Sequence, residues 1–218
     1  MTMKNFSSNF SEVETRKVST QIKTIIFDID GVLANSREAI SYNTKCLMRE
    51  FGFDVPDARI ESMSSAHSAE SVLLALAPAL SEDRVHLRKM LARLAELTKE
   101  NITLVKPSLL GVRVPEFAAK YKLAAASNRK TSAHLVLQQL GIAKYFSTVM
   151  TSSDAPPKPD PEMIRLALAN SGTRAEEAVF VGDNKEDMQA GEGAGVRAIM
   201  IDGMDEKACA KFLKEFLG

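Results

Sequence analysis

The chain has 218 residues, 45% of them apolar, and its 28 lysines and arginines balance 28 aspartates and glutamates. A chain of this length can bury one core of normal size, or a core with a modest inserted unit, without disulfide bonds. Zero net charge removes the long-range field on which nucleic-acid and membrane-surface binding usually depend, so we expect neither partner.

The N-terminal segment and the two cysteines carry little functional signal. Residues 1–21 are polar and lack the apolar stretch of a secretory signal, which predicts an unstructured arm and a cytoplasmic protein. Cys46 and Cys209 have no CxxC partner, as in proteins of a reducing compartment. The longest nearly apolar run, residues 72–80, contains Pro78 and is far shorter than the roughly 20 residues of a membrane helix.

Short apolar runs separated by helical patterns predict a parallel sheet. The helical patterns cover residues 131–140, which stop at Gly141, and 161–170, with Asp160 as the expected N-cap and Gly172 after the end. This alternation is typical of a doubly wound α/β fold. The predicted strands are residues 23–27, 122–126, 147–150, 178–181 and 197–201.

Between the first two strands, residues 35–106 have the pattern of an all-helical insertion. Two long helices are predicted, over residues 37–51 and 82–99, and no strand. The second helix has an apolar stripe that we interpret as core, formed by Leu87, Met90, Leu91, Leu94 and Leu97. We therefore predict a core of residues 22–34 and 107–218 and a helical cap at the carboxyl edge of the sheet, where it could act as a lid.

Two aspartates follow the first predicted strand directly. Asp28 and Asp30 lie two positions apart in FDIDG, so in extended backbone both carboxylates point to the same side. Two like charges in one small volume are unfavourable unless a cation lies beside them, which indicates a hard metal ion such as Mg²⁺. Gly31 then allows a tight exit from the strand. The alternative is an ordinary strand-ending turn rich in aspartate and glycine.

A second acidic pair follows the fourth predicted strand. Asp183 and Asp187 in VGDNKEDM are one helical turn apart and share a helix face. Acids at a helix N-terminus could simply complement the helix dipole. Because both pairs follow the carboxyl ends of strands in one parallel sheet, we expect the fold to bring all four carboxylates together.

Two further segments offer groups that bind phosphate. Ser127 ends the second predicted strand and Asn128 follows it at the expected start of a helix, so a hydroxyl and free backbone N–H groups lie together. Lys158 lies between Pro157 and Pro159, which restrict the backbone on both sides and hold one positive charge in place. Taken alone, Ser127 is typical of a helix cap and Lys158 of a solvated loop lysine.

The segments FDIDGVL, AAASN, KPDPEM and VGDNKEDM stand in the order and spacing of the four motifs of the haloacid dehalogenase-like superfamily, which this chain resembles from about residue 24 to residue 201. The resemblance implies a mostly parallel, doubly wound, Rossmann-like core. The helical insertion resembles the cap of the phosphoglycolate phosphatase and β-phosphoglucomutase branch.

Carried onto this sequence, the resemblance implies that Asp28 is a nucleophile that becomes an aspartyl-phosphate. Asp30 would protonate the leaving group and then deprotonate the attacking water. Ser127 and Lys158 would bind the phosphoryl oxygens, beside the N–H group of Asn128. The implied Mg²⁺ ligands are the Asp28 carboxylate, the Asp30 backbone carbonyl and Asp183, with Asp187 as a direct ligand or a support.

Two alternatives to a phosphatase stay open. A β-phosphoglucomutase-type enzyme carries a histidine twelve residues after its nucleophile, where this chain has Ile40, so mutase chemistry is disfavoured. A catalytically silent binding or regulatory module is the other alternative, although every chemical position is retained.

We therefore expect a Mg²⁺-dependent phosphatase, as a monomer or homodimer, that acts on a small phosphorylated metabolite such as phosphoglycolate or a sugar phosphate. No spacing rule decodes the cap residues that would select this substrate. The candidates are Ser64, Ser65 and His67, joined by the basic residues Arg88 and Lys89.

Overall fold

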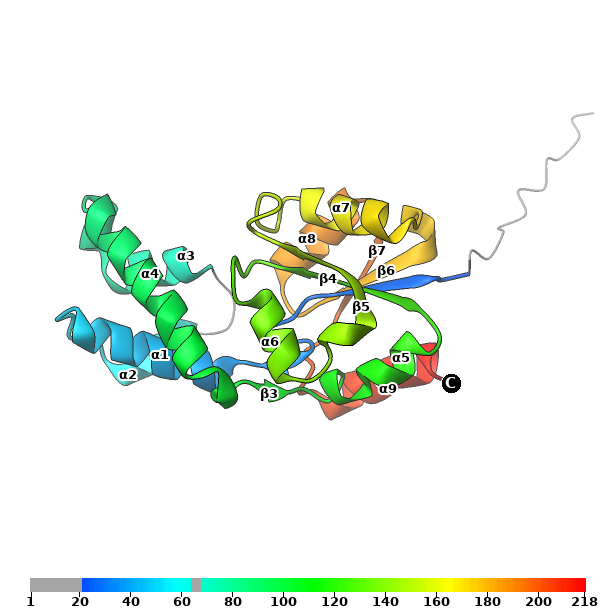
Figure 1. Cartoon of the computed structure of the whole chain (residues 1–218), viewed down its shortest axis with the longest axis horizontal. Helices are drawn as coiled ribbons and strands as arrows, with labels where there is room; N and C mark the ends of the chain where they lie inside the picture. Colours follow the sequence, from blue (N-terminus) through cyan, green and yellow to red (C-terminus); the bar gives the residue numbers. More distant parts are fainter. Residues whose placement is uncertain (1–20, 64–67) are drawn as a thin grey trace, which may run out of the picture.

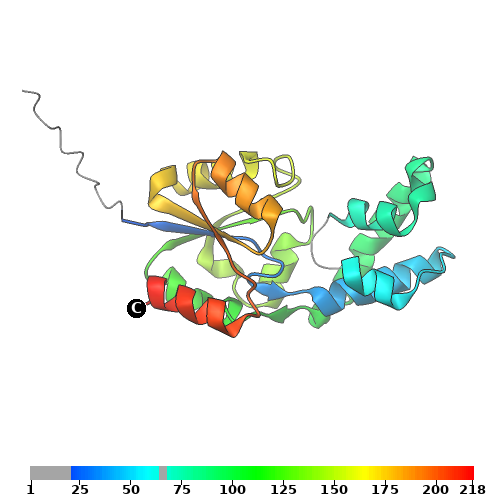
Figure 2. The same cartoon turned by 180° about the vertical axis from the view of Figure 1, so that it is seen from behind.

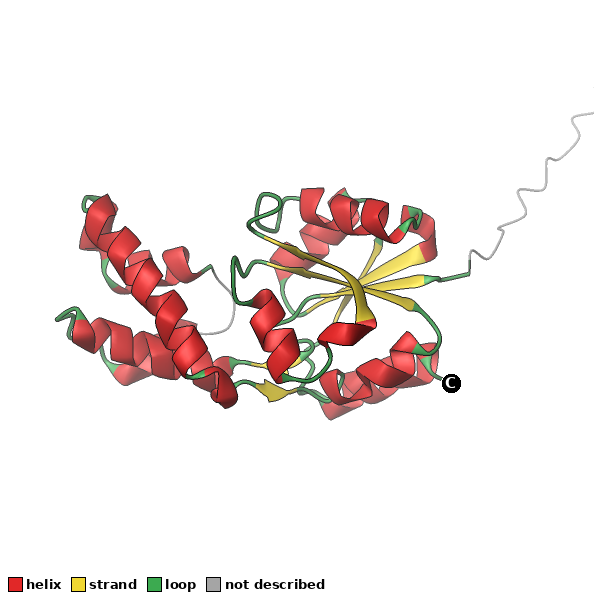
Figure 3. Cartoon of the chain, in the orientation of Figure 1, coloured by secondary structure: helices red, strands yellow, loops and turns green. Residues whose placement is uncertain are grey.

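A five-stranded parallel sheet forms the centre of the larger unit (Figures 1 and 3). The computed structural model describes residues 21–63 and 68–218. The predicted N-terminal arm, apart from its last residue, and the candidates Ser64, Ser65 and His67 lie outside those residues. In spatial order the strands are β5 (Phe146–Thr151), β4 (Lys122–Ser127), β1 (Thr24–Phe27), β6 (Ala178–Gly182) and β7 (Arg197–Met200). The five predicted strands are confirmed to within one residue at each end.

Helices cover both faces of this sheet. One face carries α7 (Glu162–Ser171) and α8 (Lys185–Gly193), and the other carries α5 (Val114–Ala118), α6 (Ala133–Gln139) and α9 (Glu206–Phe216) (Figure 1). The central strand shows why: Ile25 and Phe27 pack into the cluster that contains α5, α6 and α9, whereas Ile26 packs against α7 and α8. The predicted doubly wound α/β fold is confirmed.

Helices α6 and α7 begin later than predicted. Pro161 is the N-cap of α7, and Asp160 accepts a hydrogen bond from the Glu162 N–H group at 2.9 Å, so the cap lies one residue further along than expected. Gly172 ends this helix in the left-handed region at φ 59°, as predicted. Helix α6 begins at Ala133 instead of residue 131, and the hydroxyl of its N-cap Ser132 accepts a hydrogen bond from the Arg129 guanidinium.

The inserted unit contains four α-helices among its described residues: α1 (Arg37–Glu50), α2 (Asp57–Met63), α3 (Ala69–Leu76) and α4 (Arg84–Glu100). They pack around a separate apolar cluster that includes Leu47, Leu73 and Met90. Helices α2 and α3 were not predicted, because segments of seven and eight residues are too short to show a clear helical period.

The expectation of no strand in this region was wrong at its ends. The chain enters and leaves the helical unit through β2 (Ala34–Asn35) and β3 (Lys106–Pro107), which pair antiparallel. This small ladder holds the two connections together beside the carboxyl ends of the parallel strands (Figures 1 and 2).

Short 3₁₀ helices complete the described part of the chain. They are η1 (Pro78–Ser81), η2 (Ile102–Leu104), η3 (Gly111–Arg113), η4 (Ala143–Tyr145) and η5 (Ala175–Glu177). Within residues 21–63 and 68–218, no helix has the length and apolar character needed to span a lipid bilayer.

Candidate active site

Strand β1 delivers Asp28 to the carboxyl edge of the sheet. Its backbone N–H donates to the Val181 carbonyl at 2.8 Å, which continues the pairing of β1 with β6, and its side chain is only 7% exposed. The chain then turns sharply at Gly31, where φ is 80°. A Cβ at Gly31 would lie 1.9 Å from an Asp183 carboxylate oxygen, so this glycine also makes room for the second acidic segment.

Lys158 is a buried cation held between two carboxylates. Its Nζ lies 2.6 Å from an Asp28 oxygen and 2.6 Å from an Asp187 oxygen, and it donates to the Ala126 carbonyl at 3.0 Å. The Asn128 side chain fixes the Lys158 backbone, since its Oδ1 accepts from the Lys158 N–H and its Nδ2 donates to the Lys158 carbonyl. Lys158 is therefore rigidly mounted, as the flanking prolines predicted, but it is buried and not a solvated loop lysine.

The second acidic pair is placed by the turn between β6 and α8. Asn184 caps α8 by accepting from the Asp187 N–H at 2.9 Å, and its Nδ2 donates to the Asp183 carboxylate at 3.0 Å. The Asp187 side chain is fully buried, and its Oδ2 accepts from the Asp183 N–H at 3.1 Å. A Cβ at Gly182 would overlap the Asp187 carboxyl group, so the close approach depends on glycine.

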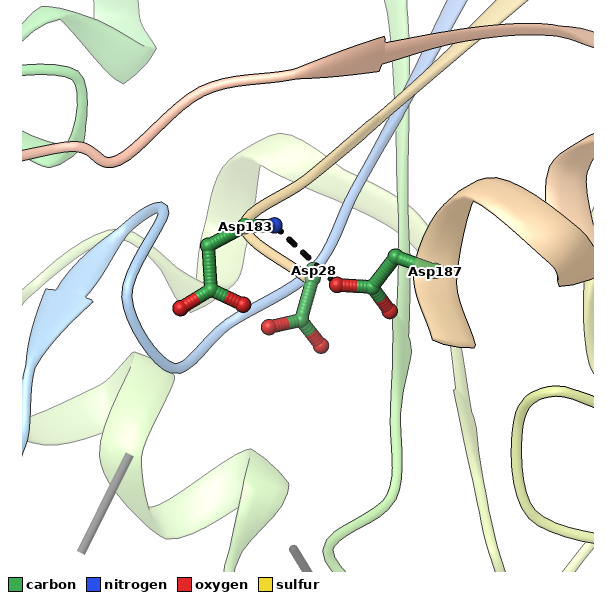
Figure 4. Close-up of side chains that lie close together, drawn as sticks. All are labelled: Asp28, Asp183 and Asp187. Atoms are coloured by element: carbon green, nitrogen blue, oxygen red, sulfur yellow. Dashed lines mark hydrogen bonds between the residues drawn. The ribbon is translucent and has the colours of Figure 1, made fainter. Parts of the chain in front are cut away.

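Three of these carboxylates converge (Figure 4). Asp28, Asp183 and Asp187 each offer one oxygen, and these oxygens all lie within 4.8 Å of one another. Carboxylate oxygens are the donors that Mg²⁺ and other hard divalent cations prefer. The donor set therefore fits a hard divalent cation at this edge of the sheet.

The fourth carboxylate has a different partner, which the sequence analysis missed. Arg129 binds Asp30 with two parallel hydrogen bonds of 2.6 and 2.7 Å, and its guanidinium also donates to the Ser132 hydroxyl at 2.9 Å. This two-point geometry is the one in which arginine holds a carboxylate most firmly. Arg129 follows the predicted phosphate-binding residues Ser127 and Asn128 directly in sequence, and this adjacency is the one feature of the sequence that could have indicated a site residue.

These six residues, which we call the charged cluster, are Asp28, Asp30, Arg129, Lys158, Asp183 and Asp187. Four carboxylates against two cations leave two negative charges when all six are ionised. One divalent cation would neutralise this excess. The two excess negative charges therefore agree with the three converging carboxylate oxygens, which are suitable ligands for such a cation.

Burial and the partners of each group shift the pKa values in opposite directions. Burial raises the pKa of Asp28 well above its ordinary value despite the neighbouring Lys158. Burial would also raise the pKa of Asp30, but the Arg129 guanidinium outweighs it and holds that pKa below the ordinary value. Burial, followed by the Asp187 charge, raises the pKa of Asp183 to about 6. Burial opposes the charge of Lys158, yet the two carboxylates keep its pKa raised.

The charged cluster opens into a cavity of about 930 Å³ between the sheet edge and the helical unit. Asp28, Asp30, Ser127, Lys158 and Asp183 line it on the side of the sheet, and α1, α3 and α4 line the opposite side. Ligands of open α/β sheets bind at this position, and the volume is that of a small-molecule site.

Two sequence-based expectations need correction here. Asn128 is not at a helix start, because residues 128–132 form a loop and its side chain is engaged by Lys158. The basic residues Arg88 and Lys89 are exposed on α4 and do not line the cavity.

Comparisons with known proteins agree on one protein family. The sequence profile of the haloacid dehalogenase-like hydrolases matches residues 25–201. The chain is 29% identical over 184 residues to a phosphoglycolate phosphatase of Vibrio cholerae, covering 80% of this chain and 81% of that one. It is 41% identical to the pyrophosphatase PpaX of Bacillus velezensis over 81 residues, which is 36% of this chain and 38% of the relative.

A solved structure shows the same fold. A Lactobacillus plantarum protein, proposed to be a phosphoglycolate phosphatase, superposes with a TM-score of 0.75 at 20% identity, covering 90% of this chain and all of that one. At 20% identity this likeness shows a shared fold alone.

Proposed function

Because this chain belongs to the haloacid dehalogenase-like hydrolase family, we propose that it is a Mg²⁺-dependent phosphatase that cleaves small phosphomonoesters through an aspartyl-phosphate. The observation that carries the proposal is the Asp28 carboxylate, held 2.6 Å from the Lys158 ammonium in the lining of the cavity. The relatives named as phosphatases support the same class of reaction.

The first step would form a bond between an Asp28 oxygen and phosphorus while the bond from phosphorus to the leaving oxygen breaks. Lys158 holds Asp28 in place for this attack and balances charge on the phosphoryl oxygens. The Ser127 hydroxyl and the Asn128 backbone N–H lie at the end of β4, where they would bind the same oxygens. Asp30, which Arg129 keeps ionised in the free protein, would first take up a proton from solvent and then give it to the leaving oxygen.

In the second step, Asp30 would take a proton from water, whose oxygen attacks phosphorus, releases inorganic phosphate and restores Asp28. Arg129, which also lines the cavity, holds the Asp30 carboxylate between these steps. The Asp28, Asp183 and Asp187 carboxylates, with the Asp30 backbone carbonyl, would hold Mg²⁺, which when bound neutralises charge that develops on the phosphoryl group.

The wall opposite the charged cluster disfavours the mutase alternative. Ile40, at the position where the mutase branch carries a histidine, lines the cavity with an apolar side chain. It cannot accept or donate the proton that a histidine would carry. Hydrolysis is therefore the better supported outcome.

The proposal is tested by phosphate release from p-nitrophenyl phosphate with MgCl₂, with EDTA, and with Asp28→Asn. We expect turnover with Mg²⁺, none with EDTA, and a loss of about 10⁴-fold or more in the variant. Asp54→Asn, at an exposed aspartate of the helical unit, is the matched control and should keep full activity. Absence of turnover would favour a silent binding module, and full activity of Asp28→Asn would overturn the aspartyl-phosphate at Asp28.

A further inference from the structure

The cavity has two chemically different sides. The sheet side carries the charged cluster, and the opposite side, which we call the helical wall, comprises the cavity-lining residues of α1, α3 and α4. In the helical wall apolar side chains dominate, and those with exposed surface include Ile40, Leu91, Leu94 and Ala95. Resting on the proposed function, we infer that the enzyme selects phosphomonoesters whose organic part is apolar, and that the helical wall binds this part.

The apolar surface of α4 extends beyond its fully buried positions, because Leu91 and Leu94 pack at the edge of the helical core and stay partly exposed. The sequence predicts one core stripe, but only Leu87, Met90 and Leu97 of that stripe are buried. Leu91 and Leu94 are half-buried and line the cavity, and with Ala95 they form a second apolar strip at helical spacing. This strip faces the space above the charged cluster, where the leaving group of a bound ester would lie.

Both charged residues that the helical wall contributes to the cavity are already paired. Arg37 on α1 donates to Asp202 at 2.7 Å, and Glu70 on α3 accepts from Arg84 at 2.8 Å. Among the described residues, the wall therefore offers no unpaired cation to a substrate carboxylate. Residues 64–67, which the structure does not describe, have the sequence Ser-Ser-Ala-His and contain no lysine or arginine.

Two neutral polar residues of the wall are also engaged within the protein. The Asn43 Oδ1 accepts from Asn101 at 2.9 Å, and the Thr98 hydroxyl donates to the Leu94 carbonyl at 2.8 Å. A substrate with many hydroxyl groups would lose water there and gain few hydrogen bonds in return. An apolar group would instead displace water from the leucine side chains, which is favourable.

Lys130 is the feature that could oppose this inference. It lines the cavity on the sheet side, is exposed, and has no ion pair with another described residue. It could bind a second anionic group, as in phosphoglycolate. The experiment must therefore separate apolar binding by the helical wall from anion binding by Lys130.

The test is kcat/KM for methyl, ethyl, propyl and butyl phosphate, beside phosphoglycolate and p-nitrophenyl phosphate, with Mg²⁺. Each buried methylene should raise kcat/KM about threefold to fourfold, and ethyl phosphate should exceed phosphoglycolate. A flat or falling series, or a preference for phosphoglycolate that Lys130→Met removes, would overturn the inference and leave the phosphatase intact. If no ester is hydrolysed, the proposed function itself fails.

Two alanine variants locate the effect. Ala95→Asn places an amide in the helical wall without touching the buried cluster, and should flatten the dependence on chain length by at least half. Ala58→Asn introduces the same residue at an exposed site of α2 outside the cavity and should leave the series unchanged. Equal series in both variants would show that the α4 face does not bind the alkyl chain.

Discussion

The sheet side and the helical side of one cavity differ in how their residues are held. In the charged cluster every carboxylate is held by hydrogen bonds or ion pairs, and Lys158 and Asp187 are almost fully buried. The helical wall presents mainly apolar side chains, and its two charges are directed to partners outside it. The residues for the reaction and the residues that select the substrate can therefore reside in separate units of one protein.

Changes in the charged cluster should then reduce turnover of the alkyl phosphates alike, whatever the length of the alkyl chain, whereas changes in the helical wall should alter which alkyl phosphate is preferred. The following variants test this division.

Among these further variants, the largest effect is expected from Lys158→Met. Removing the ammonium leaves Asp28 and Asp187 buried without their cation, which costs about 3–5 kcal/mol in the free energy of unfolding. Activity should fall about 10²- to 10³-fold because a preorganised charge at the phosphoryl group is lost. Urea unfolding in EDTA and kcat/KM across the alkyl series measure both effects.

The matched control is Lys211→Met, at an exposed lysine of α9 far along the chain from the charged cluster. It should change neither quantity. A loss in Lys158→Met that is confined to some esters would contradict the division between the two sides.

Arg129→Ala should have the next largest effect, and it should depend on the leaving group. Without the two hydrogen bonds from Arg129, Asp30 is no longer held in position to transfer a proton. Turnover of butyl phosphate, whose alkoxide needs that proton, should fall about 10²-fold. p-Nitrophenolate leaves without protonation, so p-nitrophenyl phosphate should lose much less.

An equal loss for both esters would show that Arg129 has only a structural role. Arg197→Ala, which removes a surface ion pair with Glu215, controls for the loss of an arginine and should leave both rates unchanged.

Much of this arrangement could be predicted from the sequence. The strands are apolar runs bounded by turn residues, and parallel strands place their carboxyl ends at one edge, so the convergence of Asp28, Asp183 and Asp187 followed from their positions. The mounting of Lys158 followed from its two prolines.

The remaining features depend on tertiary contacts that a linear pattern does not contain. The pairing of Arg129 with Asp30 joins loops 99 positions apart. The stripe on α4 identified apolar residues, but only the packing of neighbouring helices decides that Leu87 is buried while Leu91 faces the cavity. Helices α2 and α3 are too short to show a clear period.

A smaller effect is expected for Asp183→Asn, and its sign depends on the metal. In EDTA the raised pKa of Asp183, about 6, means that the protonated form stabilises the fold. This stabilisation is present below about pH 4, the ordinary carboxyl range, and is lost as pH rises through about 6. At pH 8 the metal-free variant should be more stable than the wild type by about 1 kcal/mol, reduced by the partial exposure of the group.

With MgCl₂ the order should reverse, because binding to the folded state stabilises the wild type and the variant has lost a ligand. Thermal unfolding at pH 5 and pH 8, with and without Mg²⁺, measures the difference in stability between Asp183→Asn and the wild type under each condition. A wild type that Mg²⁺ does not stabilise would contradict the assignment of Asp28, Asp183 and Asp187 as a metal site.

The smallest effect is expected where the helical wall is given a charge. Ala95→Lys adds an ammonium to a wall that has no unpaired cation among its described residues, whereas Ala95→Met adds a side chain of similar length without the charge. An ion pair between partly exposed groups contributes about 0.5–1 kcal/mol, so the ratio of kcat/KM for phosphoglycolate to that for ethyl phosphate should rise about twofold to fivefold in the lysine variant alone. The gain should shrink as NaCl is added, because salt screens such a pair. If Ala95→Met raised the same ratio, the added charge would not be the cause of the rise. If neither variant changed the ratio, the organic part of the ester would bind away from α4, and the division between the charged cluster and the helical wall would not hold.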